Sequence, residues 1–246
     1  KGHILKEGFI EVSIFEAITK GLKPLFETEH FAIFDKPSGL LVHPTARSTQ
    51  YTLFDEIKYH LGEEASLVHR IDAETSGLVL VSKNPYSDMV LSQMFEKKDF
   101  VKKYLAFVSG EVKEEVKIDS KIGNSQGLIK LKMSICKDGK ESSTLVKPIS
   151  YNKDKNQSLV EARPYSGRQH QIRVHLDSIG HRIIGDPIYG LDEKDANEIL
   201  NKIVTKLERL NITGASRLML QANYLEFTFL KRTYKITSKQ KFTTLH

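Results

Sequence analysis

The most distinctive stretch of the chain joins a polar segment to an uninterrupted apolar run. The polar segment is His69–Gly77, with the sequence HRIDAETSG, and the apolar run is Leu78–Val81. Four consecutive aliphatic residues that follow a glycine predict a strand buried on both faces. Charged side chains at the end of such a strand cost solvation energy unless they are paired or used. A rigid central strand beside a cleft can hold a carboxylate still, as covalent or acid–base chemistry requires.

Apolar and alternating segments elsewhere predict further strands. Strict alternation of apolar and polar residues in Ile129–Ile135 predicts a strand with one wet, basic face. The other segments of this kind are Phe31–Phe34, Leu40–Val42, Tyr104–Val108, Leu159–Arg163 and Tyr224–Leu230.

Apolar residues at helical spacing predict several helices. Asn84 followed by Pro85 is typical of an N-cap and a first helical turn. The other expected helices are Thr52–Leu61, Gln169–Ile179 and an amphipathic helix over Asp195–Leu210. Strands outnumber helices and several strands alternate. We therefore expect an α+β fold with a large mixed, mostly antiparallel sheet and flanking helices.

Composition narrows the classes of protein that the chain can belong to. Its 246 residues suffice for one large domain or two small ones. The excess of 37 Lys and Arg over 31 Asp and Glu favours a polyanionic partner such as RNA or DNA, although ordinary lysine-rich proteins share it. No apolar run approaches the roughly 20 residues of a membrane span. The single cysteine, Cys136, fits a reducing cytosol, so we expect a cytoplasmic protein.

Polar clusters at four places could carry chemistry: Asp35–Pro44, His69–Gly77, Lys103–Tyr104 and Gly167–His175. A metal site is not indicated, because His170 and His175 would point about 140° apart on a helix and no paired ligand spacing occurs. Neither a Walker nor a GxGxxG pattern is present, so we expect no nucleotide cofactor. Neither Ser76 nor Ser166 lies on the GxSxG elbow of a serine hydrolase.

Asp72 remains as the candidate reactive group. Burial at the edge of a strand raises the pKa of a carboxyl group, and a nearby guanidinium reverses that shift and keeps the group ionised. A purely structural Arg–Asp pair is the alternative. The crowding of His, Arg, Asp, Glu, Thr and Ser around Asp72, where packing alone would accept apolar residues, favours a functional site.

The same motifs resemble, in order, those of the RluA-type pseudouridine synthases. HRIDAETSG resembles the family's catalytic H-R-L-D-x-x-T-S-G, with Ile71 in place of leucine. DKPSGLLVHP, VKKYLAFVSG and PYSGRQHQIRVHL resemble its upstream, tyrosine and arginine motifs. GHRIIGDPIYG has Arg182 in place of a proline, and RLMLQANYLEF has Gln221 where a histidine is common. The resemblance extends from about Glu27 to Phe229.

The resemblance implies an RNA pseudouridine synthase that isomerises uridine without cofactor or metal, in a sheet with a central cleft. Asp72 would be the essential carboxylate, which either attacks the nucleoside or stabilises the sugar intermediate. Arg173 would pair with Asp72, and Tyr104 would stack on the target base. Arg70 would fill the space of the flipped uridine or contact a phosphate. The remaining expected substrate-binding residues are His69, Arg168, His170, Gln171 and Ile172.

The resemblance also suggests a domain organisation and partners. Lys1–Ser13 resembles the end of an S4 RNA-binding domain, so we expect residues 1–23 to be a linker or the remnant of one. Residues 24–246 would then be the catalytic domain. The expected partner is RNA, with ribosomal RNA of the large subunit preferred over transfer RNA, and the expected state is a monomer. The insertion Asp192–Gly214 is long for the family.

Two other functions compete with this interpretation. A non-catalytic RNA-binding module would keep the fold but lose Asp72, Tyr104 or Arg173, and all three are present. A small-molecule hydrolase with an aspartate nucleophile would need neither a basic surface nor a base-replacing arginine.

Overall fold

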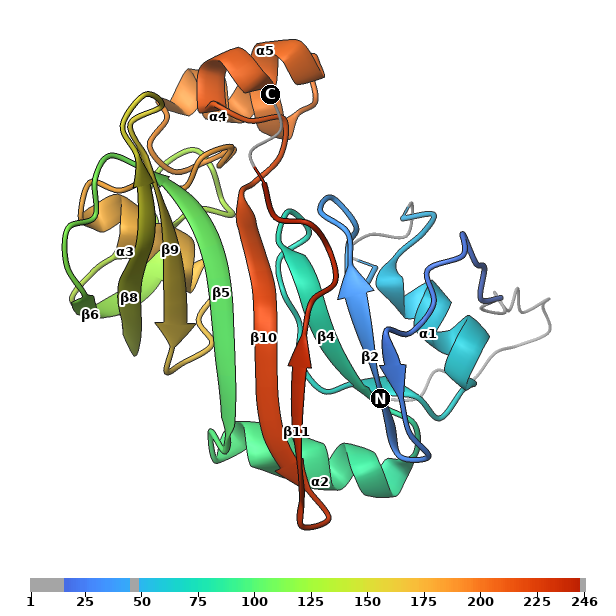
Figure 1. Cartoon of the computed structure of the whole chain (residues 1–246). Coiled ribbons are helices and arrows are strands. Elements are labelled where there is room, and N and C mark those ends of the chain that lie inside the picture. Colours follow the sequence, from blue (N-terminus) through green and yellow to red (C-terminus); the bar gives the residue numbers. More distant parts are fainter. Residues whose placement is uncertain (1–15, 45–48, 244–246) are drawn as a thin grey trace.

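The computed structural model describes residues 16–44 and 49–243, in which one large sheet is flanked by helices (Figure 1). Its strands are β1 (Phe26–Glu27), β2 (Phe31–Lys36), β3 (Ser66–Leu67), β4 (Ser76–Ser82), β5 (Phe100–Ser109), β6 (Val116–Asn124), β7 (Met133–Ile135), β8 (Lys140–Asn152), β9 (Gln157–Pro164), β10 (Leu220–Phe229) and β11 (Arg232–Thr237). Its helices are α1 (Leu53–Leu61), α2 (Pro85–Glu96), α3 (Gln171–Ser178), α4 (Glu193–Leu200) and α5 (Lys206–Thr213). The predicted α+β class is confirmed.

The order of the strands places β4, β10 and β5 next to one another in the middle of the sheet. The full order is β1-β2-β4-β10-β5-β9-β8-β6-β7, with β11 paired to β10 and β3 paired to β4. Among the described strands, β4 with β10 is the one parallel pair, and the other pairs are antiparallel. The sheet is therefore mixed and mostly antiparallel, as expected.

Gly77 allows β4 to begin against β10. It pairs with Ala222, and a β-carbon at position 77 would lie 2.2 Å from the carbonyl oxygen of Ala222. Its φ of +109° is also in the region that favours glycine. Glycine is thus required at the point where the polar segment enters the sheet.

β4 is covered on both faces, as its apolar run predicts. Leu78 and Leu80 pack on the side of α2, together with Leu91 of that helix. Val79 and Val81 pack on the opposite side, in the cluster that contains Leu53 and Ile57 of α1. All residues of β4 are buried, so this strand is a rigid base for the loop that precedes it.

Most of the expected elements are present. Asn84 caps α2, because its side chain accepts a hydrogen bond from the amide of Ser87 at 2.9 Å, and Pro85 stands in the first turn. α1 and α3 lie within the predicted helical ranges. The strands predicted from Phe31, Tyr104, Leu159 and Tyr224 form parts of β2, β5, β9 and β10, whereas the strand expected over Leu40–Val42 does not form.

The prediction of a strand over Ile129–Ile135 is wrong in its first half. Only Met133–Ile135 forms a strand, β7. The amide of Lys132 donates to the carbonyl of Ile129 at 2.9 Å and closes a turn. The alternating apolar positions therefore share no buried face, since this turn buries Ile129 and exposes Leu131.

The prediction of one helix over Asp195–Leu210 is also wrong. α4 ends at Leu200, and Lys202 has a positive φ of 57° that interrupts the helical backbone. Thr205 then begins α5 with a capping box that includes Glu208. Ile203, an apolar residue within the expected amphipathic helix, is exposed. The two short helices lie together at one end of the molecule (Figure 1).

The predicted S4 remnant at Lys1–Ser13 lies outside the described residues. The segment that follows is bound to α1 through Glu56, whose carboxylate accepts hydrogen bonds from the Thr19 hydroxyl at 2.7 Å and from the amides of Lys20 and Leu22 at 2.6 and 3.2 Å. None of the described helices combines the length and apolar character that crossing a membrane requires.

Candidate active site

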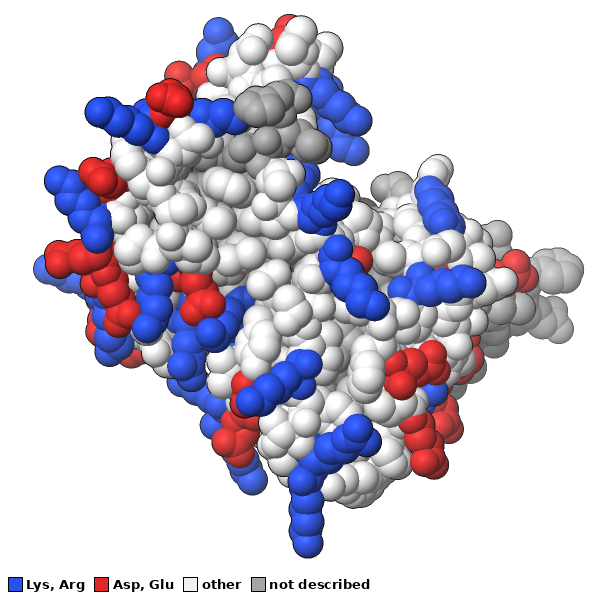
Figure 2. All heavy atoms as spheres, viewed as in Figure 1, with Lys and Arg blue, Asp and Glu red and all other residues white. Residues whose placement is uncertain are grey.

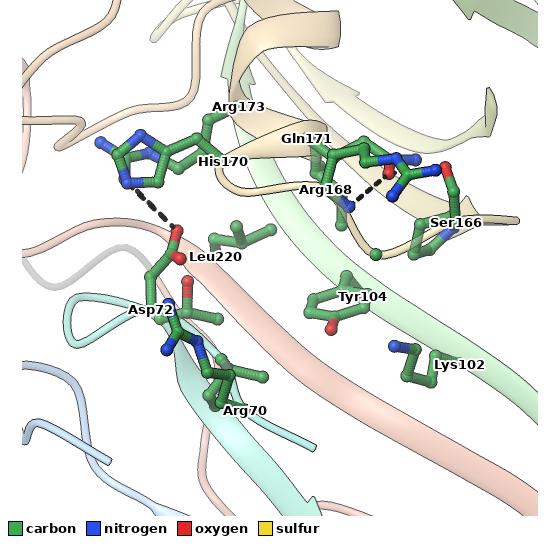
Figure 3. A pocket seen from close by; sticks show the side chains of 15 residues that line it. Arg70, Asp72, Lys102, Tyr104, Ser166, Arg168, His170, Gln171, Arg173 and Leu220 are labelled. Carbon is green, nitrogen blue, oxygen red and sulfur yellow. Dashed lines mark hydrogen bonds and ion pairs between the residues drawn. The ribbon is translucent and has the colours of Figure 1, made fainter. Parts of the chain in front are cut away.

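A pocket opens where β4, β10 and β5 adjoin the segment between β9 and α3 (Figure 3). It encloses about 510 Å³ including its open mouth. Every predicted site residue lines it except His69. The lining residues are Arg70, Ile71, Asp72, Thr75, Lys102, Tyr104, Pro164, Ser166, Gly167, Arg168, His170, Gln171, Ile172, Arg173 and Leu220.

Asp72 lies in the turn that leads into β4. The amide of Thr75 donates to the Asp72 carbonyl at 3.1 Å, which fixes this turn. The Asp72 side chain is 29% exposed. Its carboxylate is therefore largely shielded from solvent but open to a molecule that enters the pocket.

Lys36 fastens the loop that carries Asp72. Its buried ammonium donates to the carbonyls of Pro37, Leu40 and Ala73 at 3.0, 2.8 and 2.9 Å. Burial lowers the pKa of Lys36 to about 7. Three acceptors around one nitrogen match the three donors of the ammonium form, so we regard Lys36 as charged. The sequence placed Lys36 in a polar cluster but indicated no role for it.

Arg173 reaches Asp72 while a second carboxylate holds it. Its Nη1 donates to Oδ2 of Asp72 at 3.4 Å. Its Nε and Nη2 each make a 2.8 Å bond to Asp186, which is buried. Although burial alone would raise the pKa of Asp186, the charge and hydrogen bonds of Arg173 hold it below its usual value. Asp186 also accepts from the amides of Ile188 and Tyr189 at 2.9 and 3.0 Å.

Asp186 was missed in the sequence as a site residue, although it stands in the motif GDPIYG. The aromatic residue of that motif, Tyr189, is also part of the site. Its ring lies 5.0 Å from the Arg173 guanidinium carbon, in cation–π contact. The motif therefore supplies both the main ionic partner and the aromatic support of Arg173.

His170 is positioned by Tyr189. The Tyr189 hydroxyl accepts from the amide of Met133 at 3.0 Å and is hydrogen-bonded to Nδ1 of His170 at 2.9 Å. This bond orients the ring so that Nε2 lies 3.8 Å from Oδ2 of Asp72. Burial and the nearby Arg173 charge lower the pKa of His170 to about 4, so its ring is neutral at pH 7.

Tyr104 presents its hydroxyl to the pocket from β5. The residue is 8% exposed, and the hydroxyl makes no hydrogen bond with any described residue. Burial, reinforced by the Asp72 charge, raises the pKa of Tyr104, so the resting hydroxyl keeps its proton. It is available to a ligand.

Gln171 braces the wall of the pocket. Its Oε1 accepts from the Ser166 hydroxyl at 2.7 Å and from the Arg168 amide at 3.1 Å. Its Nε2 donates to Ser143 and Thr144 at 2.9 and 3.0 Å. These bonds fix the segment before α3, from which the exposed side chain of Arg168 projects at the pocket rim. The buried Ile172 supplies an apolar part of the lining.

Arg70 and His69 face different surroundings. Arg70 is exposed at the pocket mouth, and its guanidinium has no hydrogen bond or ion pair with a described residue. His69, predicted to bind substrate, lies outside this pocket. Its Nε2 accepts from the Leu80 amide at 3.1 Å, and its ring stacks on Phe95 at 4.9 Å. Burial and the charge of Lys102 lower the pKa of His69 to about 3, so its ring is neutral.

The insertion that contains α5 contacts the loop of Asp72. Nη2 of Arg209 donates to Glu74 at 2.7 Å and to the carbonyl of Gly185 at 2.9 Å. Glu74 is two residues after Asp72, and Gly185 directly precedes Asp186. Arg209 therefore links both loops that carry the site carboxylates. No local pattern in the sequence indicated this contact.

Within residues 16–44 and 49–243, no three His, Cys, Asp or Glu side chains are grouped so that they could hold a metal ion.

Comparison with known proteins agrees with this geometry. The sequence profile of the RNA pseudouridylate synthase family matches residues 30–178, more than half of the chain. The chain belongs to the RNA pseudouridine synthase family. An uncharacterised RNA pseudouridine synthase of Helicobacter pylori is 40% identical over 235 residues, which cover 94% of this chain and 76% of the relative. The predicted family is thereby confirmed.

Two further proteins show the breadth of the similarity. The ribosomal large subunit pseudouridine synthase D of Zymomonas mobilis subsp. mobilis is 33% identical, over 77% of this chain and 62% of that protein. The structure of human RNA pseudouridylate synthase domain containing 1 matches with a TM-score of 0.72, over 90% of this chain and 84% of that one. At 23% identity, this second match shows that the pseudouridine synthase fold is shared.

Proposed function

We propose that this pseudouridine synthase isomerises specific uridines of structured RNA to pseudouridine, with ribosomal RNA of the large subunit as its first candidate substrate and transfer RNA as the alternative. The observation that carries the proposal is the position of the Asp72 carboxylate. It lies in an open pocket, 3.4 Å from a buried guanidinium and among the lining residues that include the free hydroxyl of Tyr104.

The reaction begins with extrusion of the base. A stacked uracil exposes neither its glycosidic bond nor room to rotate, so the nucleotide has to leave the helix at a cost of a few kcal/mol. Arg70, exposed and unpaired among the described residues at the pocket mouth, is suited to occupy the vacated space or to hold a phosphate.

The bond changes conserve atoms. The bond from N1 to C1′ breaks, the uracil rotates, a bond forms from C5 to C1′, and the hydrogen of C5 is replaced by one on N1. No oxidant, reductant or group donor is consumed, so the reaction as proposed needs no cofactor. Cleavage leaves positive charge at the sugar, which Asp72 offsets by attack on the nucleoside or by electrostatic contact.

Tyr104 is suited to the second half of the reaction. The Asp72 charge contributes to the raised pKa of its hydroxyl. When Asp72 is engaged with the positively charged sugar, that contribution falls, and Tyr104 becomes better able to transfer a proton. The Tyr104 hydroxyl then gives up its proton, which balances the one gained at N1, and the resulting phenolate accepts the C5 proton while the ring packs on the base.

Release of tritium from RNA labelled at C5 of uridine tests the proposal, because pseudouridine formation exchanges that hydrogen. A non-catalytic RNA-binding protein would bind the RNA without release, and a small-molecule hydrolase would neither bind nor release. We also propose a cytoplasmic monomer. In sedimentation equilibrium of the purified protein, a molecular mass equal to that of one chain would support the monomer, and the mass of two chains would contradict it.

A further inference from the structure

A second cavity adjoins the Asp72 pocket on the side of α2. Its lining residues are His69, Arg70, Phe95, Glu96, Lys98, Phe100, Lys102, Ser166, Gly167 and Arg168. Half of these also line the Asp72 pocket: Arg70, Lys102, Ser166, Gly167 and Arg168. The two cavities are therefore neighbours that share one wall, and three side chains of that wall are cationic.

The far wall of this second cavity is aromatic. Phe95 and Phe100 stack with ring centroids 4.2 Å apart and an interplanar angle of 22°. His69 extends the stack on Phe95, at 4.9 Å and 12°. Both phenylalanines are only partly buried. The wall thus presents flat, apolar surface next to the site where a uridine would be bound.

Three cationic side chains, Lys98, Lys102 and Arg168, lie beside this aromatic wall. The Lys102 ammonium lies 4.7 Å from the Phe100 ring and 5.4 Å from the Phe95 ring. Among the described residues, neither Lys102 nor Lys98 has a side-chain hydrogen bond or an ion pair. Arg168 is exposed, and its Nε donates only to the carbonyl of Glu141, at 3.2 Å. Glu96 is the one acidic residue of the lining.

Lysine and arginine side chains also occur away from this cavity. On the face shown in Figure 2, Lys and Arg side chains are spread over the surface and are interspersed with acidic ones along its sides. The cations beside Phe95 and Phe100 differ because they lie next to an aromatic surface and a pocket. Sites for single-stranded RNA combine these same two components, aromatic surface for bases and cations for phosphates.

We propose that this second cavity binds the nucleotide next to the target uridine. Its base packs against the wall of Phe95 and Phe100, and the phosphate that links it to the uridine lies at the shared wall beside Lys102 and Arg168. The inference rests on the proposed function and deepens it. Two adjacent nucleotides are then unstacked together, which selects uridines in loops and bulges over those in continuous duplex.

Binding of fluorescein-labelled RNA hairpins tests this site without requiring turnover. One hairpin has an all-uridine loop, and a second has a single loop uridine flanked by abasic residues. For wild type, removal of the flanking bases should weaken binding about tenfold. Phe100→Leu should bind the all-uridine hairpin about tenfold more weakly than wild type. Removal of the flanking bases should not weaken the binding of this variant further.

Lys98→Gln and Lys97→Gln form a matched pair of substitutions that leave the packing of the core unchanged. Both lysines are exposed and adjacent, but Lys97 lines neither cavity. We expect Lys98→Gln to bind about fivefold more weakly and to reduce the salt slope by about one. Lys97→Gln should bind within about twofold of wild type, since it removes no contact of the proposed kind.

Wild-type affinity of both Phe100→Leu and Lys98→Gln for the all-uridine hairpin would overturn the second site. The second site would also be overturned if the abasic loop weakened RNA binding by the same factor in wild type and in Phe100→Leu. Tritium release by wild type separates this result from the proposed function. If wild type releases tritium but the variants bind as wild type does, only the second site is contradicted. If wild type releases no tritium from any RNA, the synthase activity is contradicted, and the binding comparison still decides whether the second site exists.

Discussion

Asp72 and Arg173 lie 101 positions apart in the sequence, yet Oδ2 of one is 3.4 Å from Nη1 of the other. The Arg173 guanidinium cannot move closer to Asp72, because two 2.8 Å hydrogen bonds hold it on Asp186. Two carboxylates share one guanidinium, so the charge of Asp72 is attracted but not fully neutralised. Asp72 therefore remains able to offset positive charge on a sugar.

Asp186→Asn tests whether the fixed guanidinium matters. The substitution leaves Arg173 buried without its main ionic partner, so the free energy of unfolding should fall by about 3 kcal/mol. Tritium release should fall as well, because Arg173 is no longer held toward Asp72. Glu115→Gln, which breaks an exposed ion pair with Lys147, is the control and should change neither. Wild-type stability and release in Asp186→Asn would contradict this role.

Tyr104→Phe tests the hydroxyl that faces the pocket. It makes no hydrogen bond with a described residue, so its removal should leave the unfolding midpoint and the RNA affinity close to wild type. The rate of tritium release should fall by about a hundredfold or more, the usual size of a proton-transfer contribution. Single-turnover assays would measure it, and an unchanged rate would exclude the hydroxyl from the reaction.

Arg209→Met tests the link between α5 and the loop of Asp72. Loss of the pair with Glu74 should loosen this loop and lower kcat by about tenfold to a hundredfold, with little change in RNA affinity. Glu74→Gln should have the same effect, and the double variant should be no worse than either single one. Lys206→Met, at an exposed position of the same helix, is the matched control. Additive losses in the double variant would show that the two residues act separately.

Buried histidines predict how stability depends on pH. Burial lowers the pKa of His175 to about 4, and its ring is bound to Ser142 and Thr144 at 3.0 and 2.9 Å. Between pH 6.5 and about 4 the unfolded chain binds a proton that the folded chain does not, so stability falls as the pH falls through this window. The slope should be about 1.4 kcal/mol per pH unit for each such histidine.

Urea denaturation between pH 7 and 5 measures this dependence. His175→Gln can keep hydrogen bonds to both hydroxyls but does not titrate. The slope of unfolding free energy against pH should therefore fall by the contribution of one histidine, about 1.4 kcal/mol per pH unit. The same substitution at the exposed His43 is the control. An identical slope in wild type and His175→Gln would contradict the neutral, buried state of His175.

The sequence predicted the parts of the site that lie on short, strongly patterned segments. The Leu78–Val81 run requires a strand covered on both faces, and Asn84–Pro85 begins a helix almost unambiguously. Asp72 was recognised because its polar neighbours precede such a strand.

Contacts between distant segments were not predictable in the same way. Asp186 and Arg209 reach the site from other parts of the chain, and no periodicity links them to Arg173 or Glu74. β8 was missed because its exposed polar positions and Pro148, where its register with β9 shifts, weaken the strand pattern. The capping box of Thr205 and Glu208 was a legible signal for the start of α5, and the longer amphipathic pattern obscured it.

The most direct test of the account compares wild type with Asp72→Asn on RNA labelled with tritium at C5 of uridine. Asn has nearly the same shape and lacks the charge, so RNA affinity should be retained. We expect tritium release by wild type and none above background by Asp72→Asn. Release by Asp72→Asn at the wild-type rate would contradict it.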